Sequence, residues 1–430
     1  MAPPMVLLDR EIEFRPDPDL RGFWGDRGPQ TRDAMTMSDQ VMEYLRTFKA
    51  RAVVHDPPKP SFLDILVPPL SDPLPPPYMG LDSGRISSTD KNLVALYAGG
   101  YRPGSSLPGG YLIYDACNDS LSVIPRLPDD DSQKALGHQS AVVMCDSQGQ
   151  GDGYLLAELV VPGLSRAEVW LWKSSASEWA LLSGSHPLPS RSSSFSVDSC
   201  FSYRGSTLCW VDLFQGILLC HLNQDYCNSK FSFIHLPPDC PTYDVDNPDY
   251  PDSARSEESR SVACVCDHIK LIALDECGLE LIVWTQSPQL SGWTRTSKYN
   301  VEQIWANVNY MSAGLTKLAL SLPVLSIHQD DVVFLVVNDD LVVDRRLVRE
   351  IQYLLRVDMK NNHVQVYPQP TWSIYSQLLA SEFSVYRRQD HPVLPPPPPP
   401  SILSFAYYCH FIYICSLSLN MLSFAGMQLY

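Results

Sequence analysis

The chain has 430 residues, of which 45% are hydrophobic and 19% charged, a composition typical of a globular protein rather than a disordered one. Its 37 prolines exclude a mostly helical fold, because proline lacks the amide hydrogen that a helix interior needs. The 48 acidic and 32 basic residues give a formal net charge of −16, which repels phosphate backbones and argues against nucleic-acid binding.

The amino-terminal region, residues 1–90, is rich in proline and predicts one short helix. Ser38 is a candidate N-cap for a helix over about residues 38–49, where apolar side chains recur at helical spacing. The apolar run 62–67 lies among prolines and is interpreted as an edge strand followed by linker. The first residues lack the long apolar segment of a secretory signal, so we expect reduced cysteines and a cytoplasmic or nuclear location.

One pattern recurs between residues 91 and 370: an apolar strand, a polar turn and a second strand. The five copies span residues 112–125, 169–181, 218–237, 281–293 and 353–368. Further strand candidates precede them at residues 93–97, 141–145, 154–159, 207–211, 262–266, 271–274 and 332–337. Several short strands per unit predict an all-β fold, a β-propeller-like array of antiparallel hairpin blades, with a pair of β-sandwiches as the alternative.

The segment 237–260 interrupts this pattern with seven acids, two bases and five prolines. Such a run is typical of a solvated insertion loop between two hairpins.

The carboxyl-terminal part changes character again. Residues 371–400 are interpreted as a linker that ends in six consecutive prolines, Pro395–Pro400, which form a stiff polyproline II spacer. Residues 401–430 contain no Asp, Glu, Lys or Arg, and the stretch 402–424 is long enough to cross a bilayer. We favour the interpretation that this tail is a gene-model artefact from a mis-predicted splice boundary. A tail anchor is the next alternative, and a terminal strand pair the third.

Motifs for phosphate binding and hydrolysis are absent or incomplete. Gly104 and Gly109 have the spacing of the two phosphate-loop glycines, but the following Lys and Ser or Thr are missing and a strand follows, so a turn is predicted. No Gly-x-Gly-x-x-Gly opens a helix and no Gly-x-Ser-x-Gly elbow occurs, which excludes kinase and α/β-hydrolase assignments.

Cys264, Cys266 and His268 form the best candidate metal set, because alternate residues of a strand share one face. Asp267 or Cys277 would complete four ligands. Structural zinc sites favour Cys-x₂-Cys knuckles, so we interpret these thiols as core packing and predict no metal and no cofactor.

A site for nucleophilic catalysis could be formed by Asp198, Asp212 and His221, together with Ser199 or Cys209. Nothing in the sequence brings these residues together, and an Asp beside a strand Trp is typical of a turn or a cross-strand hydrogen bond. We therefore predict no catalytic residues and interpret Asp212 as structural.

The run Phe201–Cys220, which contains Trp210-Val211-Asp212-Leu213 and Gly216-Ile217, resembles the signature of a plant family expanded in grasses and known only as domain of unknown function 1618. The resemblance covers most of residues 90–370. It implies a repeat region similar to the F-box-associated and kelch-like β-propellers of plant F-box proteins, and it implies no activity. The helical F-box itself is absent, because residues 38–49 are too short for one.

The leading hypothesis is a non-enzymatic protein-interaction module that presents loops, including the 237–260 insertion, to a protein partner. The alternative is a hydrolase or lyase in the central channel of the propeller, which predicts several polar or charged side chains converging at one end of the channel. Membrane contact is expected only if the 402–424 stretch is a genuine anchor.

Overall fold

The computed structural model of the chain describes one compact unit within Met1–Arg388, and Gln389–Tyr430 lie outside the described residues. The structure describes residues 3–17, 19, 36–69, 80–99, 109–128, 140–146, 153–163, 166–185, 195–223, 229–240, 256–275, 277–343, 346–370 and 377–387. The predicted polyproline spacer and the apolar 401–430 tail are therefore outside this part of the chain. No helix of the described residues is long and apolar enough to cross a membrane.

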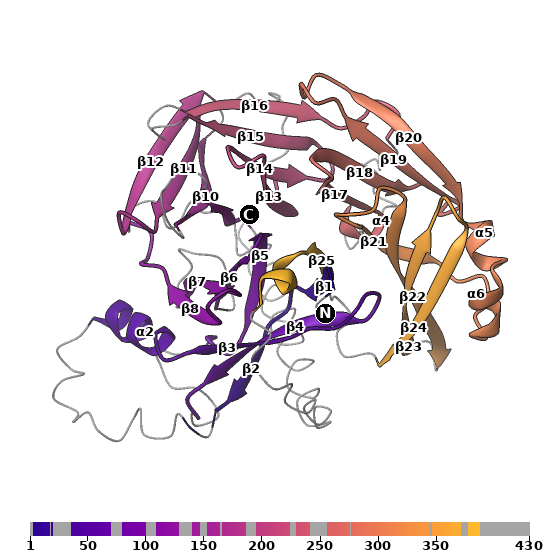
Figure 1. The fold of residues 1–430 in the computed structure, drawn as a ribbon, viewed down its shortest axis with the longest axis horizontal. Coiled ribbons are helices and arrows are strands. Elements are labelled where there is room, and N and C mark those ends of the chain that lie inside the picture. Colours follow the sequence, from indigo (N-terminus) through magenta and orange to yellow (C-terminus); the bar gives the residue numbers. More distant parts are fainter. Residues whose placement is uncertain are drawn as a thin grey trace, which may run out of the picture. The chain divides into compact units, whose positions relative to one another are not determined.

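Five four-stranded antiparallel sheets of the described residues form the blades of a ring (Figure 1). The first blade comprises β5 (Gly84–Asp90), β6 (Leu93–Ala98), β7 (Gly110–Asp115) and β8 (Ser120–Val123). The second comprises β9 (Val142–Cys145), β10 (Tyr154–Gly163), β11 (Arg166–Lys173) and β12 (Glu178–Ser185). The third comprises β13 (Ser199–Tyr203), β14 (Thr207–Asp212), β15 (Gly216–Leu222) and β16 (Ser229–His235).

The fourth blade comprises β17 (Arg260–Val265), β18 (His268–Leu274), β19 (Glu280–Gln286) and β20 (Trp293–Asn300). The fifth comprises β21 (Leu320–Leu325), β22 (Val332–Val343), β23 (Arg346–Asp358) and β24 (His363–Pro370). In every blade the strands pair in sequence order, and the first strand contacts the first strand of a neighbouring blade. The first strands, β5, β9, β13, β17 and β21, are therefore the inner strands of the ring.

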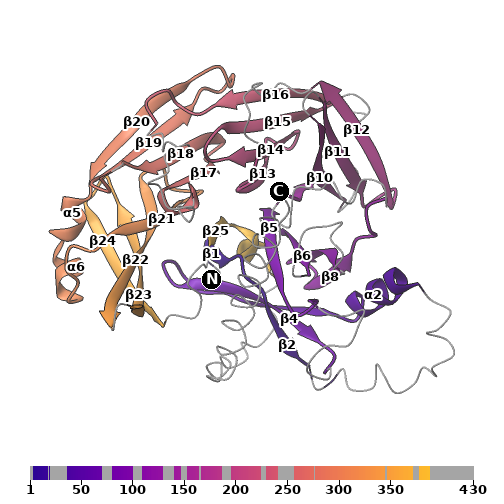
Figure 2. The ribbon, with the colours of Figure 1, turned by 180° about the vertical axis from the view of Figure 1, so that it is seen from behind.

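A mixed sheet lies between the first and fifth blades (Figure 2). It contains β1 (Val6–Asp9), β2 (Glu13–Pro16), β3 (Lys49–Val53), β4 (Pro60–Val67) and β25 (Leu378–Ser381). β4 pairs in parallel with β1 and β2 and antiparallel with β3, while β1 pairs antiparallel with β25. The sheet thus joins the beginning and the end of the compact unit.

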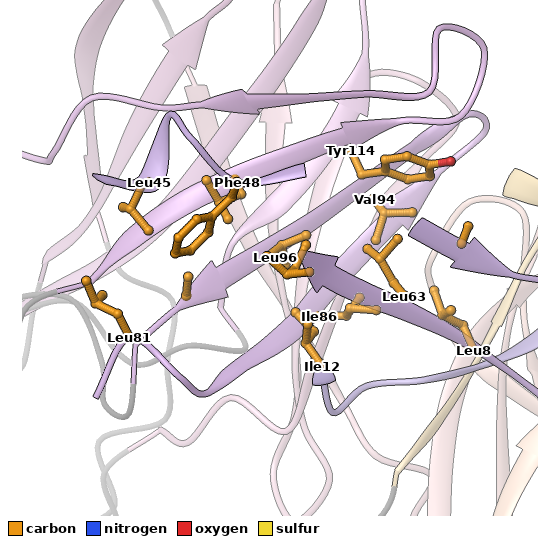
Figure 3. Packing of buried hydrophobic residues seen from close by; sticks show 14 of the residues in the cluster. Leu8, Ile12, Leu45, Phe48, Leu63, Leu81, Ile86, Val94, Leu96 and Tyr114 are labelled. Atoms are coloured by element: carbon orange, nitrogen blue, oxygen red, sulfur yellow. The ribbon is translucent and has the colours of Figure 1, made fainter. Parts of the chain in front are cut away.

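The hydrophobic core shows how this sheet closes the ring. On one side Leu8 and Leu63 pack with Ile86 and Leu96 of the first blade (Figure 3). On the other side, Leu7 belongs to a buried cluster with residues of β22 in the fifth blade. Burying each such side chain contributes about 1.5–3 kcal/mol, which favours closure over an open array of blades.

The predicted fold class is confirmed: the described part of the chain is an all-β propeller, not a pair of sandwiches. All five predicted hairpins are present as the third and fourth strands of the blades. The apolar runs predicted before them are also strands. Three inner strands, β5, β13 and β21, were not predicted, and for this reason the blades could not be counted from the sequence.

The amino-terminal region differs from the prediction in two ways. Helix α2 (Met37–Leu45) begins one residue earlier, because the side chain of Thr36 rather than Ser38 accepts the N-cap hydrogen bond from the amide of Asp39. The edge-strand prediction for residues 62–67 is wrong, because they belong to β4, which has neighbours on both sides. Pro60 is tolerated since it is the first residue of that strand.

The first blade also begins at Gly84, ahead of the predicted domain boundary at residue 91. Of the predicted insertion 237–260, residues 241–255 lie outside the described part. Its end is ordered, because the short helix α4 (Ser256–Ser259) leads directly into β17.

Candidate functional site at one end of the ring

Hydrogen bonds connect the beginnings of three inner strands at one end of the ring. The amide of Ile86 in β5 donates to the carbonyl oxygen of Arg10 at 2.8 Å. The Nη1 atom of Arg10 donates to the carbonyl oxygen of Asp198, just before β13, at 3.4 Å. Arg260, the first residue of β17, donates from Nη1 to the carbonyl oxygen of Leu213 at 2.8 Å. Since the amide of Leu213 in turn donates to Oδ2 of Asp198 at 2.6 Å, the three strand ends share one polar network.

Two arginines of this network are buried, since Arg10 is 4% exposed and Arg260 is 1% exposed. Burial, and next the neighbouring charge of Arg85, lower the pKa of Arg10 to about 10, although Cys200, Glu257 and Asp198 act in the opposite direction. A buried guanidinium is costly unless anions and hydrogen bonds surround it. Burial therefore disfavours the charged form of Arg10, and its hydrogen bond to the carbonyl oxygen of Asp198 offsets part of that cost.

The second blade contributes a buried carboxylate. Glu158 of β10 is fully buried and accepts a hydrogen bond from the hydroxyl of Ser140. Its negative charge, together with burial as the larger cause, raises the pKa of Tyr111 well above its ordinary value. The thiol of Cys200 interacts electrostatically with both Arg10 and Glu158.

The cysteines of the blades do not resemble activated nucleophiles. Burial raises the pKa of Cys145 and of Cys220 to about 12, and that of Cys264 to about 11. The pKa of Cys200 is also raised, mainly by burial, despite the nearby Arg10. A thiol must ionise before it attacks, so these environments suit packing rather than catalysis.

Asp198 and Asp212 come close together, but His221 does not join them. Asp212 accepts hydrogen bonds from the amides of Ser196, Phe214 and Gln215 and from the side chain of Gln215. His221 pairs with Thr207 at the opposite end of β14. At about 3.3 Å per strand residue that end is roughly 17 Å from Asp212. The set of Asp198, Asp212 and His221 is therefore not a catalytic triad.

The turn after Asp212 also explains the glycine in the motif. Gly216 has φ +149°, and a Cβ atom there would lie 2.1 Å from the carbonyl oxygen of Ile234 in β16. Only glycine allows this close approach of β15 to β16 without displacement. Asp212 and Gly216 thus form the two ends of one tight turn, in register opposite each other.

The candidate metal set is not assembled. Cys264 belongs to β17, but the strand ends at Val265, and Cys266 and Asp267 form a turn with φ values of +46° and +60°. The predicted sharing of one strand face is therefore wrong. Nδ1 of His268 is 2.8 Å from the carbonyl oxygen of Cys266, a local turn contact. Within the described ranges there is no group of three His, Cys, Asp or Glu residues placed to hold a metal ion.

The glycine-rich segment lies between β6 and β7, as predicted for a turn between strands, but Gly104 is outside the described residues. Gly109 packs tightly on Tyr97, because a Cβ atom there would lie 2.1 Å from the tyrosine Oη.

Sequence reasoning missed Arg10, Arg85, Glu158 and Arg260. Glu158 carried a signal, because it is the one charged residue within the apolar run 154–160. The others flank strand candidates, where a charge is ordinary, and only the ring brings them together.

Comparison with known proteins supports the family resemblance at its most specific part. Residues 210–334 match the family model described as "Protein of unknown function (DUF1618)", and the match begins at Trp210 of the recognised motif. No protein of curated function matches the sequence.

Several solved structures share a distant likeness. A GH43 β-1,3-galactosidase bound to galactodeoxynojirimycin is 10% identical over 66% of this chain and 93% of its own, with a TM-score of 0.31. An exo-β-1,3-galactanase from Phanerochaete chrysosporium with galactose is 11% identical over 65% of each chain, with a TM-score of 0.30. Hydrazine synthase of Kuenenia stuttgartiensis is 9% identical over 66% of this chain and 64% of its own, with a TM-score of 0.33. Likenesses this weak carry no argument about activity.

Proposed function

We propose that this chain is a non-enzymatic protein-interaction module, in which the propeller holds a contact surface for a protein partner. The observation that carries the proposal is a pair of exposed apolar side chains on one short helix. Val308 is 73% exposed and Met311 is 54% exposed, both on α6 (Val308–Ser312). Residues three apart on a helix share one face, so the two side chains form a single apolar ridge.

Helix α6 is held firmly although its ridge faces outward. It follows α5 (Glu302–Trp305), and the two helices lie at the outer margin of the ring beside the fifth blade (Figures 1 and 2). The side-chain amides of Asn307 and Asn309 donate to carbonyl oxygens of the fifth blade, at 3.0 and 2.8 Å. Tyr310 is fully buried, and its hydroxyl donates to the carbonyl oxygen of Thr316 at 2.9 Å. A fixed surface loses little entropy on binding, which favours recognition.

The partner that fits this ridge has an apolar contact surface with a basic rim. Covering Val308 and Met311 contributes about 1.5–3 kcal/mol for each side chain, and Met adapts its shape to different surfaces. The chain's net charge of −16 attracts a basic partner and repels an acidic one. The ion pair of Lys317 with Glu302 of α5, 3.9 Å apart, is exposed and adds little by itself.

The test is a comparison of captured proteins between the wild-type chain and the double variant Val308→Asp/Met311→Asp. Leu181→Asp is the matched control, because Leu181 is 42% exposed on β12 of a different blade. Captured proteins are identified by quantitative mass spectrometry, and the strongest candidate is purified and titrated calorimetrically. We expect the double variant to weaken binding by at least about tenfold and the control to leave it unchanged.

The proposal fails if the wild-type chain retains no protein, or if every retained protein binds the double variant as tightly. A circular dichroism spectrum shared by all variants is required, so that lost binding is not lost folding.

A second candidate is a hydrolase or lyase acting at the axis. The specific observation in its favour is the convergence of charged side chains at one end of the ring, which this alternative predicts. Glu158 is the group most suited to proton transfer, since it is fully buried beside hydroxyl groups. Turnover of a chromogenic glycoside or ester that disappears in Glu158→Gln, with unchanged folding, would favour the enzyme. Equal turnover by the wild-type chain and the Glu158→Gln variant would contradict this second candidate function.

A further inference from the structure

The turn between β19 and β20 of the fourth blade contains the dipeptide Ser287-Pro288. It is the only Ser-Pro in the 430 residues of the sequence, and Thr-Pro does not occur. Pro288 is exposed and Ser287 is half-buried. A residue before proline favours extended backbone, and proline itself has no amide hydrogen. Proline-directed protein kinases select serine in this setting, so the turn presents their substrate dipeptide at the surface.

The hydroxyl of Ser287 already lies beside hydrogen-bond donors of its own turn. The amide of Ser291 donates to Oγ of Ser287 at 2.9 Å, and the two hydroxyl oxygens share a hydrogen bond at 3.1 Å. The backbone of Ser287 is fixed by hydrogen bonds with Gly292 and Leu290, both at 2.9 Å. Ser291 therefore offers an amide and a hydroxyl to a phosphate on Ser287, and hydrogen bonds to an anion are stronger than those to a neutral hydroxyl.

An arginine of the third blade reaches the same turn. Arg204, between β13 and β14, donates from Nη1 to the carbonyl oxygen of Pro288 at 3.4 Å and from Nη2 to that of Asp267 at 3.5 Å. Both contacts are exposed, long and to neutral oxygens, and no carboxylate of the described residues forms an ion pair with Arg204. Its guanidinium group is therefore available to a phosphate on the residue next to Pro288, since arginine binds phosphate through two parallel hydrogen bonds.

We infer that Ser287 is a phosphorylation site for a proline-directed protein kinase, and that its phosphate binds Ser291 and Arg204. The kinase transfers the γ-phosphoryl group of Mg²⁺-ATP to Oγ of Ser287. The new O–P bond forms as the bond from the γ-phosphorus to its bridging oxygen breaks, ADP leaves, and the hydroxyl proton passes to the catalytic aspartate of the kinase. The added charge of about −1.5 to −2 ties the turn of the fourth blade to the third blade through Arg204.

The first test asks whether the folded chain accepts phosphate at this position. The full chain is incubated with a purified proline-directed kinase and Mg²⁺-ATP, and phosphopeptides are quantified by mass spectrometry. We expect phosphate on Ser287 and none on Ser312, which is exposed but is not followed by proline. Pro288→Ala keeps the hydroxyl and should slow phosphorylation of Ser287 by at least about tenfold. No phosphate on Ser287 of the folded chain overturns the inference, as do equal rates in the wild-type chain and Pro288→Ala.

The second test asks whether Arg204 holds the phosphate. Urea denaturation of the phosphorylated chain should give an equilibrium constant for unfolding about threefold to tenfold below that of the unmodified chain. Arg204→Gln should remove most of this difference. Arg356→Gln is the matched control, because Arg356 also donates to a neutral oxygen, that of Gln329 in the fifth blade, and should leave the difference unchanged. A phosphorylated chain that is no more stable, or an equal gain in Arg204→Gln, refutes the role of Arg204.

The phosphorylation site does not depend on the protein-interaction function of the α6 ridge. The Val308→Asp/Met311→Asp variant should therefore accept phosphate on Ser287 at the wild-type rate, whatever happens to partner binding. A slower rate at Ser287 in that variant would contradict the independence of the two surfaces.

Discussion

Substituting Gly216 by Ala tests the tight turn that joins β14 to β15. The added Cβ would lie 2.1 Å from the Ile234 carbonyl oxygen, whereas such contacts are essentially never under 3.0 Å, so β15 and β16 must separate by roughly 0.9 Å. Forced repacking of this kind costs about 1–3 kcal/mol. The positive φ of +149° adds about 1–2 kcal/mol, because a Cβ atom is unfavourable there. Together we expect a loss of about 2–5 kcal/mol in the free energy of unfolding.

Gly278→Ala is the matched control, because Gly278 has φ +67° but no atom within 4 Å of its added Cβ. At Gly278 the substitution carries only the cost of placing alanine at a positive φ. The lower conformational entropy of the unfolded alanine variant offsets about 0.4–1 kcal/mol of that cost. Urea denaturation followed by tryptophan fluorescence gives both free energies. If Gly216→Ala is no less stable than Gly278→Ala, the close approach of β15 and β16 is not the reason for the glycine.

Three further perturbations test other parts of the fold. Trp210 is fully buried and donates from Nε1 to the carbonyl oxygen of Ser140 at 2.7 Å, which joins the third blade to the second. Trp210→Phe should lower the free energy of unfolding by about 1–3 kcal/mol in urea denaturation. An unchanged midpoint would show that this hydrogen bond does not stabilise the ring. Burial raises the pKa of Asp90, so its ionised form is less favourable folded than unfolded. This contribution lowers the free energy of unfolding as pH rises from the pKa of Asp90 in the unfolded chain through its raised pKa in the folded chain. Asp90→Asn should therefore flatten that part of the curve of stability against pH. A variant curve with the wild-type slope would contradict the raised pKa of Asp90. Cys266 is exposed whereas Cys209 is fully buried; burial raises the pKa of both thiols, that of Cys209 well above its ordinary value. Iodoacetamide should therefore modify Cys266 in the folded chain about a hundredfold faster than Cys209, as measured by peptide mass spectrometry, and comparable rates would show that the third blade opens readily.

The outer parts of the blades were predictable because their side chains carry a strong local signal. The runs of β7, β11, β15, β19 and β23 are apolar and end in polar turns, and each occurs as the third strand of a blade. The motif from Trp210 to Gly216 also predicted a strand, a turn and a strand without any distant contact. These strands and turns depend on residues within about ten positions along the chain, so a local sequence pattern is enough to predict them.

The inner strands lacked that signal. β5 reads Gly84-Arg85-Ile86-Ser87-Ser88-Thr89-Asp90, and β13 contains two serines among five residues. Such polar strands are stable because their hydroxyl groups bond across blades, as Ser88 does to the carbonyl oxygen of Ala141 at 2.8 Å. That partner is 53 residues away, so no local pattern indicates it.

The candidate site likewise depends on contacts between residues far apart in the sequence, which no local pattern indicates. From its sequence alone this chain could be assigned to an all-β propeller with a family motif, because hydrophobic alternation and turn chemistry are local properties. The closing of the ring by β1 and β25, and the meeting of Arg10, Arg85 and Asp198 at its end, were decided only by the tertiary structure. Arg10 and the carbonyl of Asp198 are 188 residues apart, and burial alone gives their contact its electrostatic significance.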